Sequence, residues 1–269
     1  MDELSRAVKK AASIERVDFD EALWLLSKAD LLTLGESAAH VRNQFHPEPL
    51  VTYVVDRNIN YTNICMSGCR FCAFFKSVED PEGYVISEED LERKIQETLE
   101  LGGTQILLQG GIHPDLGLDY YENLLKFIKS RFSIHIHGFS PPEIAFISEK
   151  ENMPLAKVIG RLMEAGLDSI PGGGAEILVD SVRKRVSPNK CSAEGWLEVM
   201  RTAHGMGLKS TATMMFGHVE QKADIIAHLL RIREIQDETG GFTAFIPWSF
   251  QPENTRSEER RVGKECATG

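Results

Sequence analysis

Cysteine is scarce in this 269-residue chain except in one short stretch. The chain has five cysteines, and three of them, Cys65, Cys69 and Cys72, lie within "NICMSGCRFCAFF". A disulfide framework uses an even set of cysteines spread along a short secreted chain, so an odd, clustered set argues against one. The cluster indicates metal or redox chemistry in a reducing compartment.

Long apolar runs and excess positive charge are also missing. No apolar run approaches the roughly 20 residues that span a bilayer, and residues 1–26 are acidic and helix-like, without the apolar core of a signal peptide. The net charge is −10, and no basic stripe is interleaved with aromatic residues. We therefore expect a cytoplasmic protein that acts on a small molecule and binds neither nucleic acid nor membrane.

The rest of the sequence alternates between helical and strand patterns. Residues 1–50 predict an N-terminal helical extension, because leucines such as Leu23 and Leu26 recur among charged residues until prolines end the pattern. From residue 51 onward, helical stretches end at a glycine and pass directly into an apolar strand, as in "ELGGTQILLQGG" and "ETGGFTAFIPW". Strand–helix repeats of this kind predict an α/β fold with a parallel sheet.

One predicted strand favours a barrel over an open sheet. In "FSIHIHGFS", residues 132–140, the apolar side chains share one face while Ser133, His135 and His137 share the other. A barrel interior that holds a ligand tolerates polar residues, whereas a strand covered by helices on both sides is apolar on both. The same alternation puts Thr211 and Thr213 on one face. We therefore predict a barrel with its site at the C-terminal ends of the strands.

The clustered cysteines are spaced four and then three residues apart, so all three can turn toward one point. Thiolates are soft ligands that suit zinc or an iron–sulfur cluster. A structural zinc site normally has four ligands, and no second Cys-x-x-Cys or spaced histidine pair follows. Three cysteines leave one iron of a 4Fe-4S cluster free for a small molecule. A zinc site completed by a histidine is the alternative.

The stretch "CMSGCRFCAF" resembles the C-x-x-x-C-x-aromatic-C signature of the radical S-adenosylmethionine family. The resemblance implies a partial TIM-like (β/α)6 barrel. It also implies that Cys65, Cys69 and Cys72 bind a 4Fe-4S cluster, with Phe71 as the aromatic residue of the signature. S-adenosyl-L-methionine would chelate the open iron, and an electron donor such as flavodoxin or ferredoxin would reduce the cluster.

Other stretches extend the resemblance to the S-adenosyl-L-methionine site. Gly110 and Gly111 end the predicted strand "QILLQGG", and the corresponding glycines of the family contact the methionine amino group. An ordinary turn is the alternative reading. Glu176 in "IPGGGAEIL" resembles the family's ribose-hydroxyl acceptor, although a carboxylate at the start of a helix often only complements the helix dipole. Ser140, after the third predicted strand, is a further candidate for cofactor binding.

Within the family the likeness is strongest to the branch that makes menaquinone through futalosine. It includes "LLQGGIHPDLGLDYYENLL", "HIHGFSPPEI" and "PGGGAEIL" and covers nearly all of the chain up to Thr255. The resemblance implies cyclisation of dehypoxanthine futalosine, begun by a 5′-deoxyadenosyl radical that takes hydrogen from the ribose. Two alternatives are the aminofutalosine-forming enzymes and the enzymes that build the deazaflavin chromophore. A third is a non-catalytic iron–sulfur or zinc protein.

Polar residues near the predicted strand ends are candidates for substrate binding. They are His137, Thr211, Thr213 and His218. Arg183 can pair with a carboxylate on substrate or cofactor through two parallel hydrogen bonds. Each has a structural alternative, because buried histidines and strand threonines are common, and an arginine on a helix is often solvated.

The final residues depart from the pattern of strands and helices. Arg256 to Cys266 reads as a translation, in one frame, of a common sequencing adapter, so we expect residues 256–269 to be a non-native tail. The predicted division is a helical extension at 1–50, a truncated barrel core at 51–255 and this tail. Family members continue beyond Thr255, so we expect the barrel to stay open after its sixth strand, with apolar surface exposed.

Overall fold

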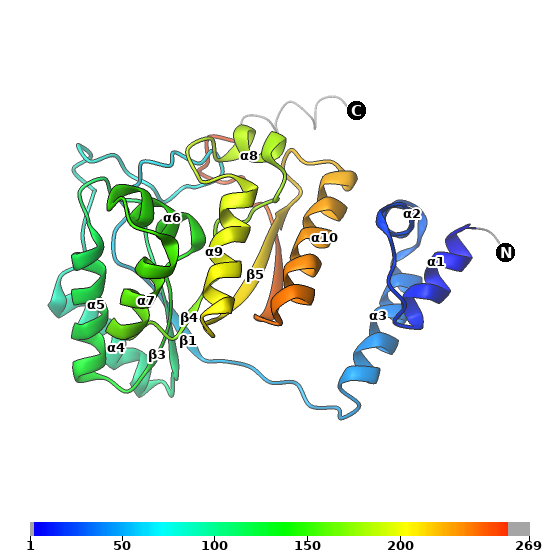
Figure 1. Cartoon of the computed structure of the whole chain (residues 1–269), viewed down its shortest axis with the longest axis horizontal. Helices are drawn as coiled ribbons and strands as arrows, with labels where there is room; N and C mark the ends of the chain where they lie inside the picture. Colours follow the sequence, from blue (N-terminus) through cyan, green and yellow to red (C-terminus); the bar gives the residue numbers. More distant parts are fainter. Residues whose placement is uncertain (1–2, 258–269) are drawn as a thin grey trace.

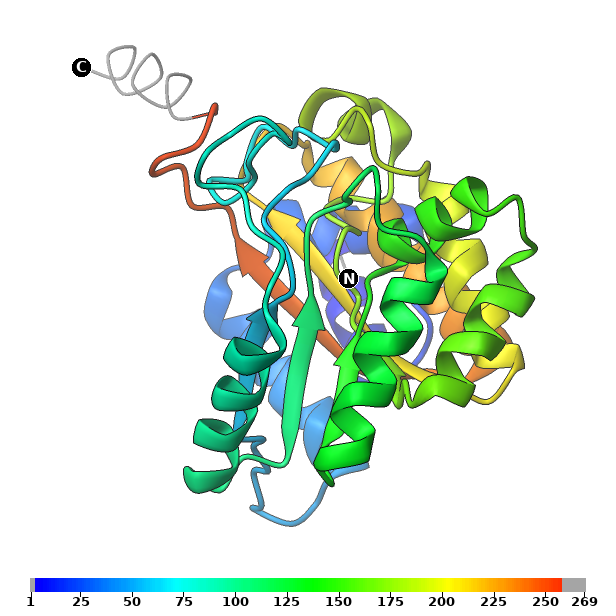
Figure 2. The ribbon, with the colours of Figure 1, turned by 90° about the vertical axis from the view of Figure 1, so that its left-hand side faces the viewer.

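The computed structural model describes residues 3–257, and its centre is one sheet of parallel strands. In sheet order the strands are β1 (Asp56–Asn60), β2 (Gln105–Gln109), β3 (His135–Gly138), β4 (Ser169–Ile170), β5 (Lys209–Phe216) and β6 (Phe242–Ser249). Each strand pairs in parallel with the next one along the chain. The sheet curls into a half-barrel with helices around it, so the predicted partial barrel is confirmed (Figures 1 and 2).

Helices connect the strands and cover the outside of the sheet (Figure 1). They are α4 (Glu88–Glu100), α5 (Leu118–Arg131), α6 (Pro141–Lys150), α7 (Leu155–Ala165), α8 (Asp180–Val186), α9 (Ala193–Gly205) and α10 (Lys222–Thr239). α4 begins where the Ser87 side chain accepts a hydrogen bond from the Asp90 amide, as the sequence predicts. α7 and α10 end at Gly166 and Gly240, whose left-handed backbone suits glycine.

Side-chain alternation separates the core from the barrel interior. In β2, Ile106 and Leu108 are fully buried in the hydrophobic core, while Leu107 lines an interior cavity. In β3, Ile136 is fully buried and His137 faces that same cavity. The predicted split between an apolar face and a polar face of this strand is therefore confirmed.

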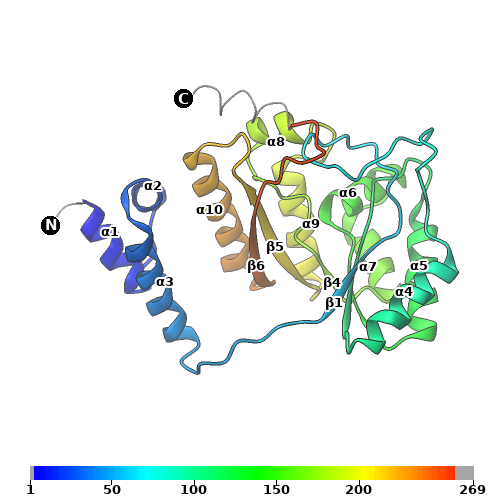
Figure 3. The same ribbon diagram turned by 180° about the vertical axis from the view of Figure 1, so that it is seen from behind.

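The first part of the chain is helical, as predicted, and packs as a small unit of α1 (Glu3–Ala12), α2 (Phe19–Lys28) and α3 (Leu31–Phe45). α2 lies against α10 (Figure 3). Arg16 forms an ion pair with Asp237 of α10, and Arg233 donates to the Val17 carbonyl at 2.9 Å. An exposed segment, residues 46–55, then leads to β1 (Figures 1 and 3).

Strand β6 forms one edge of the sheet. Ile246 and Trp248 on this strand are 42% and 41% exposed and line the interior cavity, and the neighbouring Phe245 is 40% exposed. Residues 258–269, most of the predicted tail, lie outside the described residues. Among the described residues, Arg256 places its guanidinium over the Phe75 ring, 4.7 Å from the centroid. No helix within residues 3–257 has the length and apolar character to cross a bilayer.

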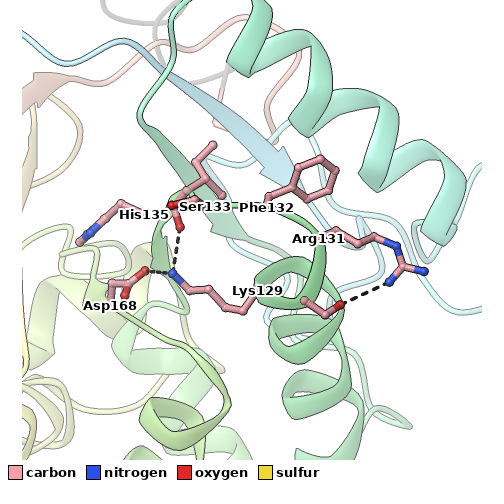
Figure 4. Close-up of a pocket in the computed structure, with 8 residues that line it drawn as sticks. Lys129, Arg131, Phe132, Ser133, His135 and Asp168 are labelled. Carbon is pink, nitrogen blue, oxygen red and sulfur yellow. Dashed lines mark hydrogen bonds and ion pairs between the residues drawn. The ribbon is translucent and has the colours of Figure 1, made fainter.

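The N-terminal ends of the strands form the base of the half-barrel. A depression of about 600 Å³ lies there beside β3 and is lined by Lys129, His135 and Asp168 (Figure 4). The Lys129 ammonium contacts the Asp168 carboxylate at 2.6 Å and the Ile134 carbonyl at 2.9 Å. The charges at the base are therefore paired with each other.

Candidate active site

A larger cavity, of about 710 Å³, occupies the interior of the half-barrel and reaches the C-terminal ends of the strands. Its volume is typical of small-molecule sites. The predicted residues that line it are Cys65, Cys69, Phe71, Cys72, Gly110, Gly111, His137, Ser140, Glu176, Thr211 and Thr213. The structure thus brings together residues that lie on, or shortly after, five different strands. Arg183 and His218 do not line the cavity.

The loop that follows β1 arches over the strand ends and carries the three cysteines (Figure 2). Backbone hydrogen bonds fix it: the Cys65 amide donates to the Lys76 carbonyl at 3.0 Å, and the Met66 amide donates to the Ile112 carbonyl at 3.0 Å. Cys65 Sγ accepts from the Ile112 amide at 3.3 Å. The loop is therefore held in shape by the end of β2.

The three thiols share one environment. Burial raises the pKa of the Cys69 thiol to about 11, and the nearby Lys190 ammonium opposes this rise, while Cys65 and Cys72 add to it. The sulfurs are therefore close enough to interact. No group of three or more His, Cys, Asp or Glu side chains among residues 3–257 is arranged around a single metal ion. An iron–sulfur cluster does not need three side chains around one metal ion, because each thiolate binds a different iron.

A buried hydroxyl in the same loop is left without a protein partner. Ser67 is fully buried and lines the cavity, and its Oγ makes no hydrogen bond to any described residue. A buried polar group of this kind normally has a partner. Together with the three thiols, the Ser67 hydroxyl fits a site for a bound cofactor that offers a hydrogen-bond acceptor.

Gly110 and Gly111 let β2 approach the cysteine loop. A Cβ at Gly111 would lie 2.1 Å from the Ile64 carbonyl oxygen, and one at Gly110 would lie 2.8 Å from the Tyr61 ring. The sequence suggests close approach of a ligand at these glycines. In the structure the close approach is that of the cysteine loop, although both glycines also border the cavity.

Ser140 belongs to a buried hydrogen-bond network around Glu143. The Glu143 carboxylate accepts from the Tyr61 hydroxyl at 2.6 Å, the Gly110 amide at 3.2 Å and the Ser140 amide at 2.8 Å, and it also accepts from the Ser140 hydroxyl. Burial raises the pKa of this carboxyl, and the four donors oppose the rise. The network ties together the ends of β1, β2 and β3 at the cavity wall.

Glu176 is a buried carboxylate with a cation on each side. It is 4% exposed; its Oε1 lies 2.9 Å from Lys190 Nζ and its Oε2 lies 3.4 Å from Arg183 Nη1. Burial acts to lower the pKa of the Lys190 ammonium, but the Glu176 carboxylate outweighs it, so the pKa is raised. Both Glu176 and Lys190 line the cavity. The pair therefore presents a charged wall to a bound ligand.

The backbone around Glu176 differs from the prediction of a helix start. The helix α8 begins at Asp180, and residues 171–179 form an irregular segment. Glu176 has a φ of 41°, and Gly174 has a φ of 75° with no room for a side chain, because a Cβ would lie 2.3 Å from Pro142. Left-handed backbone at a non-glycine residue is costly and is often found at functional sites.

Arg183 supports this segment from behind the cavity. Its side chain is 3% exposed, and its guanidinium donates to the carbonyls of Gly174 at 3.0 Å, Ala175 at 2.8 Å and Cys191 at 2.6 Å. It is therefore neither solvated nor available to a ligand. We read it as a positioning residue that holds Glu176 and the strained backbone in place.

His137, Thr211 and Thr213 form a polar patch on the interior wall. His137 Nε2 lies 3.3 Å from Thr211 Oγ1, and Thr211 Oγ1 accepts a hydrogen bond from the Gly172 amide at 3.0 Å. Thr213 donates to the Gly172 carbonyl. Burial lowers the pKa of His137 to about 4, with the nearby His135 as a further cause, so its imidazole is neutral at pH 7 and can accept a proton.

His218 lies away from the cavity, against Phe250 and Ser257. Its ring centroid is 4.2 Å from that of Phe250, and its Nε2 is 2.9 Å from Ser257 Oγ. The sequence candidates also omit the cavity residues Ser67, Glu143 and Lys190. The Ser140–Glu143 spacing is that of a capping box and could have identified Glu143. No local pattern identifies Lys190.

The curated proteins that are similar to this chain include enzymes of two different activities. The chain is 47% identical to the cyclic dehypoxanthine futalosine synthase of Halalkalibacterium halodurans, over 92% of this chain and 67% of the relative. It is 43% identical to the protein of that name from Streptomyces coelicolor, over 96% of this chain and 66% of the relative. The 5-amino-6-(D-ribitylamino)uracil–L-tyrosine 4-hydroxyphenyl transferase of Methanopyrus kandleri is 44% identical, over 81% and 60%.

Solved structures share the fold at low sequence identity. The FeFe-hydrogenase maturase HydG from Carboxydothermus hydrogenoformans matches with a TM-score of 0.72 at 17% identity, over 95% of this chain and 58% of that one. Methylornithine synthase (PylB) matches with a TM-score of 0.70 at 16% identity, over 93% and 69%. These likenesses support the partial-barrel fold.

The family assignment comes from the sequence over the barrel itself. The pattern of the Radical SAM superfamily matches residues 59–232, which run from β1 through α10 and include all three clustered cysteines. The chain spans about two thirds of the length of the two synthases. The chain belongs to the Radical SAM superfamily.

Proposed function

We propose that the chain is a radical S-adenosylmethionine cyclase that converts dehypoxanthine futalosine to its cyclic form in menaquinone biosynthesis. The observation that carries the proposal is the single interior cavity that joins the three-cysteine loop to a polar wall. The 47% and 43% identity to two synthases of this activity supports the choice of reaction.

Members of the superfamily bind a 4Fe-4S cluster and S-adenosyl-L-methionine. The residues of this chain fit both, because three thiols and the unpartnered Ser67 hydroxyl border one cavity. Cys65, Cys69 and Cys72 would hold the cluster. When bound, the cluster and S-adenosyl-L-methionine supply a 5′-deoxyadenosyl radical, which takes the hydrogen from the 4′ carbon of the substrate ribose. A flavodoxin or ferredoxin is the proposed source of electrons.

The protein's own contribution is position and exclusion of water. Phe71, Phe74 and Trp248 give the cavity apolar walls, which keep stray proton and hydrogen donors from a radical. The polar wall of His137, Thr211 and Thr213 gives hydrogen-bonding groups that can orient the ribose.

Substrate chemistry then requires a proton acceptor. The ribose carbon radical would add to the attached aromatic ring, and aromaticity returns when the ring loses one electron, for which the oxidised 4Fe-4S cluster is the proposed acceptor, and one proton. A proton on a ring that has lost its aromaticity is strongly acidic, so a weak base suffices. The buried, neutral His137 is such a base at the cavity wall.

The predicted cofactor residues border the same cavity as the cysteines, and we propose these roles for them. Phe71 and Lys190 stand together, with the ammonium 5.4 Å from the ring centroid. Gly110, Gly111 and Ser140 border the cavity where β2 and β3 end. Glu176 keeps its proposed role with the ribose of S-adenosyl-L-methionine, and the Arg183 and Lys190 cations on either side fix its position.

We propose a division of labour among the parts of the chain. Residues 51–255 carry the barrel and its site, and residues 1–50 add a helical unit that lies against α10. The residues after Thr255 have no role in this proposal.

A second candidate is the transferase reaction named for the Methanopyrus kandleri relative. Its 44% identity lies between the values for the two synthases, so overall similarity alone does not separate the two activities. The substrate must decide, because only the cyclase forms a ring within one molecule.

The test is an anaerobic assay of the reconstituted chain. It receives S-adenosyl-L-methionine, a reductant and either dehypoxanthine futalosine or the transferase substrates, and mass spectrometry quantifies 5′-deoxyadenosine and products. We expect 5′-deoxyadenosine together with a product two hydrogens lighter than dehypoxanthine futalosine. The Halalkalibacterium halodurans relative is the positive control. A product that joins the uracil and tyrosine substrates, with none from dehypoxanthine futalosine, would contradict the cyclase proposal.

A further inference from the structure

Two histidines of β3 are joined by one hydroxyl of β4. His137 Nδ1 lies 2.7 Å from Ser169 Oγ, and His135 Nε2 lies 2.7 Å from the same oxygen. On its other side, His137 Nε2 lies 3.3 Å from Thr211 Oγ1. The strand register explains the contacts, because His137 pairs with Ser169 while His135 is two residues earlier on the same face.

The two histidines open into different cavities. His137 is 9% exposed and lines the interior cavity, whereas His135 is exposed and lines the depression at the base (Figure 4). Ser169, 8% exposed, lies between them. A continuous row of hydrogen bonds therefore connects the interior of the half-barrel to the solvent at its base.

A serine hydroxyl has one proton, so it donates to one histidine and accepts from the other. In one of the two arrangements His137 donates from Nδ1 to Ser169, and Ser169 donates to Nε2 of His135. This arrangement leaves a lone pair on His137 Nε2, which faces Thr211 Oγ1 at 3.3 Å on the cavity wall. It is the arrangement that can take up a proton inside and release one at the base.

We propose that His137, Ser169 and His135 conduct the proton that cyclisation releases from the interior cavity to the solvent at the base. The proposal rests on the cyclase function proposed above. His137 Nε2 takes the proton from the substrate ring, the Nδ1 proton of His137 passes to Ser169, and the Ser169 proton passes to His135 Nε2. His135 then releases its Nδ1 proton to water. No oxidant or co-reactant is needed, because only protons move along this row.

The surroundings favour this route. The other ionisable groups near His137 are His135 and Asp56, and Asp56 Oδ2 already accepts from Gln105 at 3.2 Å. At the base, the Lys129–Asp168 pair is closed on itself and leaves the His135 ring as the group that can exchange protons with water. A bound substrate would cover His137 from the cavity side, so the path through Ser169 stays open during turnover.

Two substitutions test the row at different points. Ser169→Ala removes the central hydroxyl, and His135→Ala removes the exit. In both variants we expect the rate of cyclic product formation to fall by a factor on the order of 10². A first-turnover burst of 5′-deoxyadenosine should remain, because hydrogen abstraction comes before proton loss. Ser169→Thr retains a hydroxyl and should restore most of the product.

Chemical rescue separates proton transfer from a structural role. Because His135 is exposed, added imidazoles should restore the rate of cyclic product formation in His135→Ala in proportion to their basicity. They should not restore this rate in Ser169→Ala. Ser210→Ala is the matched control, since Ser210 Oγ also lies 2.7 Å from a histidine, His204 Nε2, but neither residue lines the cavity. It should keep the wild-type ratio of product to 5′-deoxyadenosine.

An independent readout uses the chain without cofactors. ¹⁵N NMR of labelled histidines should show His137 with a protonated Nδ1 and a bare Nε2 at pH 7, and Ser169→Ala should change that tautomer. Wild-type His137 protonated at Nε2 would overturn the proposal, as would full cyclisation by Ser169→Ala. If the wild-type chain forms no cyclic product, both the cyclase function and the proton path are overturned. If the wild-type chain cyclises the substrate and both variants do so equally well, only the proton path is overturned.

Discussion

The two ends of the same sheet are built on different principles. At the base, the Lys129 ammonium and the Asp168 carboxylate satisfy each other beside an open depression. At the C-terminal ends, three thiols, the unpartnered Ser67 hydroxyl and the left-handed Glu176 surround a cavity. The base closes its own interactions, while the other end leaves groups whose partners have to come from a ligand.

The difference teaches where stability and chemistry reside. Buried polar groups without partners and strained backbone cost free energy, so they persist where a bound molecule repays them. The four donors on Glu143 and the cations on Glu176 hold that end rigid without closing it. In parallel α/β barrels the C-terminal ends of the strands carry the active site, and the larger cavity of this chain reaches those ends.

The largest expected effect is at the cysteine loop. Cys69→Ala should abolish cluster binding and reduce 5′-deoxyadenosine formation to the background level, because two thiolates cannot hold the cluster. Iron and sulfide per chain, measured after reconstitution, check the result. Cys191→Ala is the matched control, because Cys191 lies outside the cavity and should retain the full iron content. Full iron content in Cys69→Ala would contradict the proposed ligand set.

The next effect is at the buried charged wall. Glu176→Gln leaves the Lys190 and Arg183 cations uncompensated in a buried site, which should lower the free energy of unfolding by about 3–5 kcal/mol. Urea unfolding measures it. The control is Glu198→Gln, whose carboxylate pairs with Arg201 at 2.9 Å on the surface and is 54% exposed. That change should cost less than about 1 kcal/mol. Equal losses of unfolding free energy in the two variants would show that the buried ion pairs of Glu176 stabilise the fold no more than the surface pair does.

Acid should weaken the fold through its buried histidines. Burial lowers the pKa of His137, His204 and His228 to about 4, whereas the unfolded chain titrates near pH 6.5. Between these values the unfolded chain binds more protons, so the free energy of unfolding falls as pH falls from 6.5 toward 4. Each histidine contributes up to about 1.4 kcal/mol per pH unit.

His228 is the best probe of this effect because it is fully buried, with Nδ1 accepting from the Leu178 amide at 3.0 Å. His228→Gln should reduce the pH slope of the urea midpoint between pH 6.5 and 5, and stability above pH 7 should be flat with respect to this group. An unchanged slope in His228→Gln would show that its burial does not control its protonation.

The smallest effect is at the base. The Lys129 and Asp168 side chains are 30% and 33% exposed, so Lys129→Met should lower the free energy of unfolding by no more than about 1 kcal/mol. Formation of 5′-deoxyadenosine should equal that of the wild type. A loss of 5′-deoxyadenosine formation in this variant would show that the two ends of the sheet are not separate in function.

Local patterns predicted the framework because they depend on residues close in sequence. The alternation around Ile136 and His137 gave the two faces of β3, and Ser87 gave the start of α4. The cysteine spacing gave the family. These signals are local, and the structure changes none of them.

Other features depend on contacts between distant residues and left no local pattern. The position of Lys190 against Glu176, the clamp of Arg183 on three carbonyls and the shared Ser169 hydroxyl each follow from how loops meet in space. The sequence placed Glu176 at a helix start, but a buried ion pair overrides that local preference. His218 follows β5, yet the chain there turns it toward Phe250.

A radical formed in this cavity, next to the substrate ribose, would carry the label of an isotopically marked ribose into 5′-deoxyadenosine. Dehypoxanthine futalosine deuterated at the 4′ carbon is turned over anaerobically by the reconstituted chain. We expect 5′-deoxyadenosine that carries one deuterium and a cyclic product that has lost it. Deuterium retained in the product, with unlabelled 5′-deoxyadenosine, would contradict hydrogen abstraction from the 4′ carbon.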